Sequence, residues 1–326
     1  MESKYEIKIG DALSELKKLE SESVDCSISS PPYWNLRDYQ TKGQLGLEEK
    51  PEEFISKLCD IYDEVKRVLK KSGTVFVNIS DTYSGNKKGK TDAKISEYVK
   101  ESQTALIKRA PIQEKSLVGI PEMFVIEMQK RGWIRRNTIV WWKRNAMPSS
   151  VKDRFNVDFE YIYFFTKHQK YFFNQQFEGY APSSDVRYRQ ALRANKSYNL
   201  KKPYQKNTPY FGNYKRGTGS VVSCGNDSDG LVVGGRTEGR NMRTVWDIPT
   251  VPSTEPHFAM YPEKLVERLV ESGCPPKGLI LDSFSGMATT GMVASKLGRK
   301  YIGIEISEKY ARRSIERLDS ITPPMF

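Results

Sequence analysis

Two short segments near opposite ends of the chain combine residue types that can do chemistry. The first, Ser30-Pro31-Pro32-Tyr33, follows an apolar stretch typical of a strand. Two prolines cannot continue a sheet ladder, so they predict a rigid corner at the strand's end. A hydroxyl, proline-fixed carbonyls and an aromatic ring at such a corner suit a flat ring that forms hydrogen bonds. The alternative is a structural turn with an aromatic side chain packed on it.

The second segment is a strand-turn-helix pattern that begins at Leu279 and contains Asp282 and Gly286. A turn of small residues lets a ligand approach the backbone where the helix begins. Glu305 ends the next predicted strand, where a carboxylate can accept hydrogen bonds from both hydroxyls of a ribose. The paired strand ends favour a cofactor that contains adenosine, although Asp282 as a simple helix cap is the alternative. A dinucleotide such as NAD is disfavoured because the turn has one glycine.

Alternating strand and helix patterns position these two segments. We predict strands at 5–9, 24–29, 74–79, 138–142, 160–166, 279–282 and 301–305, and helices at 12–19, 51–69, 121–131, 262–272, 289–297 and from 308 to about 318. Strands that alternate with helices bury both faces of a sheet. The predicted fold class is therefore α/β, a mainly parallel sheet covered by helices.

Composition points to a polyanionic partner. The 326 residues suffice for a core and a smaller second domain, and 52 Lys plus Arg stand against 40 Asp plus Glu, for a net charge of +12. The cysteines, Cys26, Cys59, Cys224 and Cys274, form no C-x-x-C pair, so we expect reduced thiols and no metal site. Neither a membrane-spanning apolar run nor a signal-peptide pattern is present, which predicts a soluble, cytoplasmic protein.

Two stretches differ from this regular texture. Residues 184–246 contain 12 Lys plus Arg against 4 Asp plus Glu, interleaved with tyrosines and one phenylalanine. Basic side chains beside aromatic ones suit phosphate contact and base stacking, although a solvated insertion has the same composition. Residues 84–114, rich in Lys, Gly, Ser and Thr, are predicted to form a long mobile loop that orders on a ligand.

The motifs resemble those of a known enzyme family. Ser30-Pro31-Pro32-Tyr33 resembles the catalytic motif of DNA amino-methyltransferases, and the segment from Asp282 to Thr290 resembles their cofactor motif. Residues 257–265 are similar to the segment that holds the methionine end of the cofactor, and Gly10-Asp11-Ala12 to the one that meets its adenine. The catalytic motif precedes the basic region and the cofactor motif follows it, an order that resembles the circularly permuted beta group of SPPY type. The family usually has Pro in place of Ser283 and Ser-Gly in place of Met287-Ala288.

The resemblance implies a Rossmann-like methyltransferase sheet, circularly permuted, with an inserted DNA-recognition region. It divides the chain into a catalytic half at 1–169, a target-recognition region at 170–246 and a cofactor-binding half at 247–326. The implied cofactor is S-adenosyl-L-methionine, and the expected residues that bind it are Asp11, His257, Phe258, Pro262, Asp282, Phe284, Gly286, Thr289, Thr290 and Glu305. The expected partner is duplex DNA, with a cognate restriction endonuclease as a second possible partner. The expected DNA contacts are Arg187, Arg189, Arg193, Lys201, Lys202, Lys215 and Arg216.

The implied reaction is methyl transfer to an exocyclic amine of a base flipped from the duplex. Tyr33 is expected to stack on the base, while Ser30 Oγ and the Pro31 carbonyl accept hydrogen bonds from the amine; Pro32 completes the motif. Serine is typical of family members that modify cytosine N4, whereas those acting on adenine N6 usually have Asp, so cytosine N4 is favoured. Room around Tyr33 and Trp34 must fit the base.

Several other interpretations remain open at the level of sequence. They are an adenine N6 enzyme, an amino-methyltransferase acting on RNA or protein, a non-catalytic DNA-binding protein and a basic structural scaffold. Methylation at cytosine C5 is disfavoured because it needs a cysteine nucleophile, and none of the four cysteines follows a proline.

Overall fold

The computed structural model describes residues 5–36, 38–39, 41–84, 112–179, 240–251 and 261–321, together with the backbone of 222–224 and 231–233. The chain divides into two compact units, one made by 1–174 with 244–326 and the other by 175–243. The first unit contains both motif segments, which come from opposite ends of the chain.

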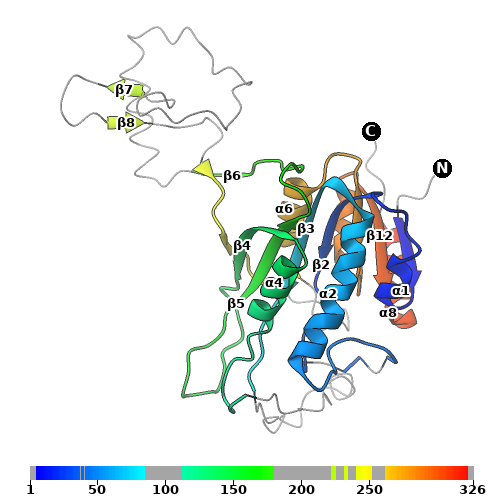
Figure 1. Cartoon of the computed structure of the whole chain (residues 1–326). Coiled ribbons are helices and arrows are strands. Elements are labelled where there is room, and N and C mark those ends of the chain that lie inside the picture. The colour runs from blue at the N-terminus through cyan, green and yellow to red at the C-terminus, as the bar shows by residue number, and fades with distance from the viewer. Residues whose placement is uncertain are drawn as a thin grey trace. The chain divides into compact units, whose positions relative to one another are not determined.

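An eight-stranded sheet forms the centre of the first unit, in the order β1-β12-β11-β2-β3-β5-β4-β10 (Figure 1). Its strands are β1 (Tyr5–Ile9), β2 (Val24–Ser29), β3 (Leu69–Ile79), β4 (Ile134–Trp142), β5 (Phe159–Thr166), β10 (Val245–Asp247), β11 (Leu279–Asp282) and β12 (Lys300–Glu305). β5 runs antiparallel to β3 and β4, and every other neighbouring pair is parallel. The prediction of a mainly parallel α/β sheet is confirmed.

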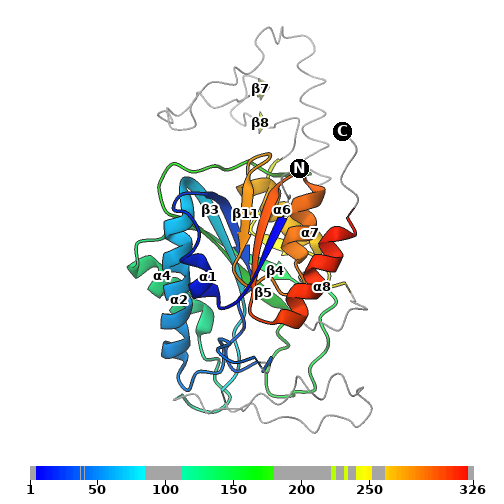
Figure 2. The same ribbon diagram turned by 90° about the vertical axis from the view of Figure 1, so that its right-hand side faces the viewer.

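Helices cover both faces of this sheet. α1 (Ala12–Leu16), α2 (Pro51–Val68) and α4 (Ile120–Lys130) lie on one face, and α6 (Glu263–Gly273), α7 (Thr289–Lys296) and α8 (Glu308–Asp319) on the other (Figure 2). α2 and α4 meet through an edge-to-face contact of Tyr62 and Phe124, with ring centroids 5.4 Å apart. None of the helices within the described ranges is both long and apolar enough to cross a membrane.

Three predicted boundaries differ from the observed ones by three residues or more, for non-local reasons. β4 begins at Ile134 rather than at residue 138, because Ile134 and Arg135 pair with β5. α1 ends at Leu16 rather than Leu19, because the Arg67 guanidinium donates to the carbonyls of both residues, at 2.8 and 2.9 Å. β3 begins at Leu69 rather than Thr74, because Leu69 pairs with Val24 before an irregularity in the register. In each case a distant segment sets the boundary.

The carboxyl ends of β1, β2, β11 and β12 meet at one edge of the sheet, because these strands are parallel neighbours. Antiparallel pairing of β5 with β3 and β4 places the start of β5 and the end of β4 at the same edge. The segments after β2 and β11, which contain the two chemical motifs, therefore converge there.

The second unit contains two short antiparallel pairs, β6 (Phe177–Glu178) with β9 (Arg240–Asn241), and β7 (Val222–Cys224) with β8 (Leu231–Val233). Glu178 accepts from Arg243 at 2.6 Å and lies 2.8 Å from Arg240. The predicted DNA contacts, Arg187, Arg189, Arg193, Lys201, Lys202, Lys215 and Arg216, lie outside the described residues, as does most of the predicted loop at 84–114. These assignments stay predictions.

Candidate active site

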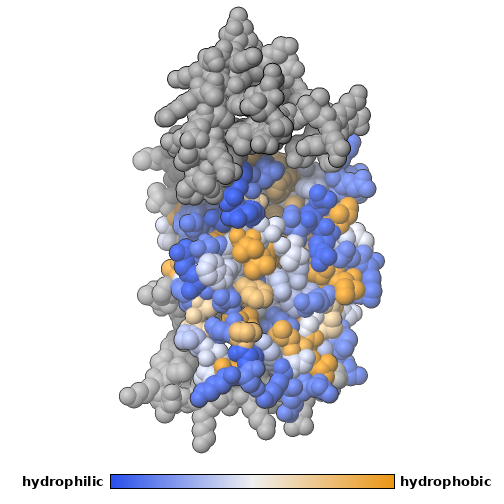
Figure 3. All heavy atoms as spheres, turned by 90° about the vertical axis from the view of Figure 1, so that its left-hand side faces the viewer, coloured by the Kyte–Doolittle hydropathy of each residue, from blue (hydrophilic) through white to orange (hydrophobic). Residues whose placement is uncertain are grey.

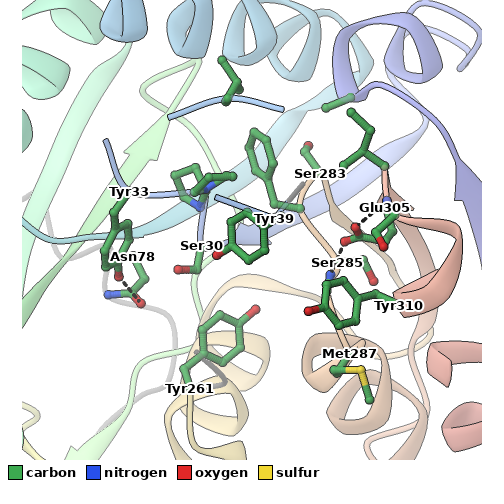
Figure 4. Close-up of a pocket in the computed structure, with 18 of the residues that line it drawn as sticks. Ser30, Tyr33, Tyr39, Asn78, Tyr261, Ser283, Ser285, Met287, Glu305 and Tyr310 are labelled. Atoms are coloured by element: carbon green, nitrogen blue, oxygen red, sulfur yellow. Dashed lines mark hydrogen bonds between the residues drawn. The ribbon is translucent and has the colours of Figure 1, made fainter. Parts of the chain in front are cut away.

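A cavity of about 570 Å³ lies at the carboxyl edge of the sheet. Figure 4 shows Tyr33 and Asn78 at one end of it, Glu305 and Tyr310 at the other, and Ser30, Tyr39 and Tyr261 between them. Four of the predicted catalytic residues line it, Ser30, Pro31, Pro32 and Tyr33. So do five of the predicted cofactor residues, Asp11, Phe284, Gly286, Thr289 and Glu305.

The corner at Ser30 is held rigid by the segment that follows it. Trp34 is 1% exposed and donates its indole N–H to the Glu48 carbonyl at 3.1 Å. The Asn35 N–H donates to the Gly46 carbonyl at 2.7 Å, and a Cβ at Gly46 would lie 3.0 Å from the Tyr33 carbonyl oxygen. Glycine at 46, with φ of +96°, is therefore required for this close approach.

The structure corrects one expectation about this corner. Trp34 belongs to the hydrophobic core beneath the corner and does not line the cavity. Its ring is turned inwards because its indole N–H finds an acceptor there. Trp34 therefore fixes the corner, and the room for a base is bounded by other side chains.

A polar cluster fixes the Tyr33 side chain at its end of the cavity. The Tyr33 hydroxyl donates to Glu160 Oε2 at 2.6 Å and lies 3.2 Å from Asn78 Oδ1. Asn78 Nδ2 donates to the same Glu160 oxygen at 2.9 Å, and Lys143 Nζ bonds to the other oxygen. Lys143 also lies 4.7 Å from the centroid of the Trp141 ring. Burial, followed by the Glu160 charge, raises the pKa of Tyr33 well above its ordinary value, so the phenol is neutral and a donor.

Sequence reasoning missed Asn78, Lys143 and Glu160. A usable signal was present, because Asn78 lies within the apolar run of β3 and Glu160 lies within the aromatic run of β5. Polar side chains in strands that are otherwise apolar are uncommon unless they have partners.

At the other end of the cavity, the turn after β11 presents backbone and small side chains. Gly286 N–H donates to Glu305 Oε2 at 2.8 Å, and Ser285 N–H donates to the Ile304 carbonyl at 2.9 Å. Ala288 adopts φ of +54° and ψ of +39°, the left-handed geometry for which glycine is usual. Ala288 therefore holds the turn in a backbone geometry that glycine adopts at lower cost.

Glu305 is nearly enclosed at the wall of this end. Its two carboxylate oxygens accept from the Gly286 and Ser307 N–H groups, each at 2.8 Å, and its exposure is 9%. Burial raises the pKa of Glu305 to about 7, against the opposing effect of these backbone hydrogen bonds. Hydroxyl groups of a ligand that donate hydrogen bonds to such a carboxylate would stabilise its charged form.

Asp282 lies behind the wall. It is 1% exposed and accepts hydrogen bonds from Thr290 Oγ1 at 2.6 Å, Phe284 N–H at 3.1 Å and the Tyr261 hydroxyl at 3.2 Å. Burial raises its pKa to about 6. Asp282 and Thr290 therefore hold the turn and Tyr261, which lines the cavity. Pro262, the next residue, is the N-cap of α6 and is not among the residues that line the cavity. His257 and Phe258 lie outside the described residues.

Comparison with known proteins decides the family. A family model described as a DNA methylase, N6_N4_Mtase, matches residues 24–316. The chain belongs to this N6/N4 DNA methylase family. The type II methyltransferase M.Cfr9I of Citrobacter freundii is 35% identical over 314 residues, which cover 95% of this chain and 86% of the relative.

Two solved structures share the fold. The PvuII cytosine-N4-specific DNA methyltransferase has a TM-score of 0.61 at 17% identity and covers 98% of this chain and 89% of its own. A putative DNA modification methylase of Thermus thermophilus, complexed with S-adenosyl-L-methionine, has a TM-score of 0.56 at 19% identity, over 98% and 96%. The DNA methylase described here is a methyltransferase of the kind found in restriction-modification systems, and its cofactor is S-adenosyl-L-methionine.

The size and the lining of the cavity suit this cofactor independently of the comparisons. Its volume lies in the range of small-molecule sites. The Ser283 hydroxyl is buried in the wall and has no hydrogen-bond partner among the described residues, so it offers an unused polar group. Glu305 adds an acceptor suited to hydroxyl groups. When bound, the cofactor supplies an electrophilic methyl group on a sulfonium.

Proposed function

We propose that this DNA methyltransferase modifies N4 of cytosine in a specific site of duplex DNA. The observation that carries the proposal is Ser30, whose residue type is typical of N4 enzymes and which lies between the Tyr33 end and the Glu305 end of one cavity. A base held at Tyr33 and a cofactor held at Glu305 would meet at Ser30.

The chain's own residues would act by orientation rather than by covalent chemistry. The lone pair of an exocyclic amine is delocalised into its ring, so the amine is a weak nucleophile. Hydrogen bonds accepted by Ser30 Oγ and the Pro31 carbonyl would turn the lone pair towards the methyl group. Tyr33 would stack on the extruded base. Held at the Glu305 end, S-adenosyl-L-methionine would supply the methyl group and leave as the thioether, while Ser30 and Pro31 would keep the amine in line with it. The methylated nitrogen, now acidic, would lose its proton to water.

The cysteines support this direct transfer over methylation at carbon. Cys26, Cys59 and Cys274 are buried, and burial raises the pKa of each thiol, to about 12 for Cys59 and Cys274. A nucleophilic cysteine needs a lowered pKa and access to substrate. No cysteine is among the described residues that line the cavity.

We assign the remaining predicted residues as follows. Glu305 would accept hydrogen bonds from the ribose hydroxyls, while Asp11, Phe284, Gly286 and Thr289 line the cofactor end. Asp282 and Thr290 would act through the turn that they hold. The basic segment with Arg187, Arg189 and Arg193 would contact DNA phosphates. A cognate endonuclease would recognise the same site.

Identification of the product base tests the proposal. Unmethylated genomic DNA is incubated with the protein and S-adenosyl-L-methionine, digested to nucleosides and measured by mass spectrometry, with total RNA as a parallel substrate. We expect N4-methylcytosine from DNA and no product from RNA. N6-methyldeoxyadenosine as the sole new nucleoside from DNA would instead assign the adenine reaction.

The link between Glu160 and Tyr33 gives a second prediction. Tyr33→Phe and Glu160→Gln should each lower kcat/KM by roughly 10-fold or more, because each removes a hydrogen bond to a charged group. If Glu160 acts by fixing the Tyr33 ring, kcat/KM of the double variant should be little lower than that of either single variant. Losses that multiply would show that Glu160 acts independently of the phenol.

A further inference from the structure

The loop that joins β4 to β5 begins and ends in the active site. Lys143, the first residue after β4, and Glu160, the second residue of β5, both line the cavity. Between them Phe155 is 96% exposed and Met147 is 89% exposed. The loop leaves the sheet at the carboxyl edge, beside the segment after β3 (Figure 1).

This loop is held by several neighbouring segments. Its base is closed by Lys143 N–H to the Asp158 carbonyl at 2.7 Å, and Asn145 bonds to the backbone of Thr250 at 2.8 and 2.9 Å. The Arg154 guanidinium lies 3.4 Å from the centroid of the Tyr83 ring. Phe155, the next residue, is nevertheless almost fully exposed, so the fold gains no burial from its ring.

Exposure by itself proves little, since single apolar side chains are ordinary on protein surfaces. Figure 3 shows apolar side chains scattered among hydrophilic ones on the coloured part of one face. What distinguishes Phe155 is its place on a held loop whose flanking residues, Lys143 and Glu160, line the cavity, together with charge. Residues 143–158 contain four Lys plus Arg and two Asp, which suits a phosphate backbone.

We propose that Phe155 inserts into duplex DNA beside the target base and fills the space that the extruded base leaves. Apolar side chains such as Phe and Met are those that wedge between base steps and offset the loss of stacking. Met147, on the same loop, would pack against the neighbouring base pair or sugar. The proposal rests on the proposed extrusion of the target base.

The test compares Phe155→Ala with wild type on two duplexes that contain the recognition site, mapped beforehand by sequencing methylated DNA. In one duplex the target base is paired, and in the other it faces an abasic position. Single-turnover methylation of the paired target should fall about 10- to 100-fold, because extrusion then lacks its wedge. On the unpaired target the loss should shrink to within about threefold, and Phe155→Leu should recover part of the rate.

Ile126→Ala, which removes an apolar side chain exposed by 54% on α4, is the matched control and should leave both rates unchanged. No loss on the paired target, or equal losses on both duplexes, would overturn the wedge. The proposal would also be overturned if Phe155→Ala changed the oligomeric state, measured by sedimentation, but not the rate of methylation. Phe155 would then be a contact between two copies of the chain. If the wild-type protein forms no N4-methylcytosine on either duplex, the proposal that cytosine N4 is the target is wrong. The comparison of rates still tests the role of Phe155 for whichever base is methylated.

Discussion

Ser30→Ala is expected to slow methyl transfer at least about 100-fold and to leave the affinity for S-adenosyl-L-methionine within about twofold of wild type. The hydroxyl is the only group that this change removes, and it lies between the two ends of the cavity rather than at the cofactor end. Without it the amine has one acceptor fewer to orient its lone pair. Single-turnover transfer and calorimetric titration of the cofactor measure the two quantities.

The neighbouring serine provides a matched control. Ser29 is 1% exposed, and its hydroxyl lies 2.8 Å from that of Tyr62, away from the cavity. Ser29→Ala should cost about 1 kcal/mol of unfolding free energy and leave methyl transfer nearly unchanged. Near-normal transfer by Ser30→Ala would move the reaction away from this corner, whatever the control shows.

Glu305→Ala is expected to weaken cofactor binding by on the order of 1.5 to 3 kcal/mol, or roughly 10- to 150-fold. The change would remove the acceptor proposed for the ribose hydroxyls and would also free the Gly286 N–H that shapes the turn. Calorimetry on the folded variant measures the effect. Glu308→Ala, which removes an exposed carboxylate three residues away, serves as control and should bind normally. Unchanged affinity in Glu305→Ala would mean that the carboxylate only supports the turn.

Glu305 also predicts how binding depends on pH. Burial raises its pKa to about 7 in the free protein, so at pH 6 most molecules hold a proton that must leave before the carboxylate can accept two hydrogen bonds. Affinity should therefore rise about tenfold between pH 6 and pH 8 and then level off, with proton release on binding. Calorimetry in buffers of different ionisation enthalpy detects the proton. Glu305→Ala should lose this dependence; a wild-type affinity that is flat over the same range would refute it.

Local patterns were enough to predict most of the scaffold. Alternation and helical spacing predicted seven of the eight strands of the sheet and the six helices described beside it, with errors at the end of α1 and at the starts of β3 and β4. β10 was missed because three residues show no periodicity, and it exists only through pairing with β4. The corner at Ser30 could be predicted because prolines restrict their own backbone wherever they occur.

The sequence by itself determined the α/β class and the two motifs, since each depends on residues that are adjacent or one helical turn apart, and the order of the motifs is read directly along the chain. Tertiary structure alone decided which side chains face the cavity. Asn78, Lys143 and Glu160 meet Tyr33 because β3, β4 and β5 pair across long separations, and no local pattern reports that register. Trp34 turns into the core and Asp282 lies behind the wall because distant hydrogen-bond partners orient them. The identity of a residue limits what it can do, whereas its non-local contacts decide what it faces.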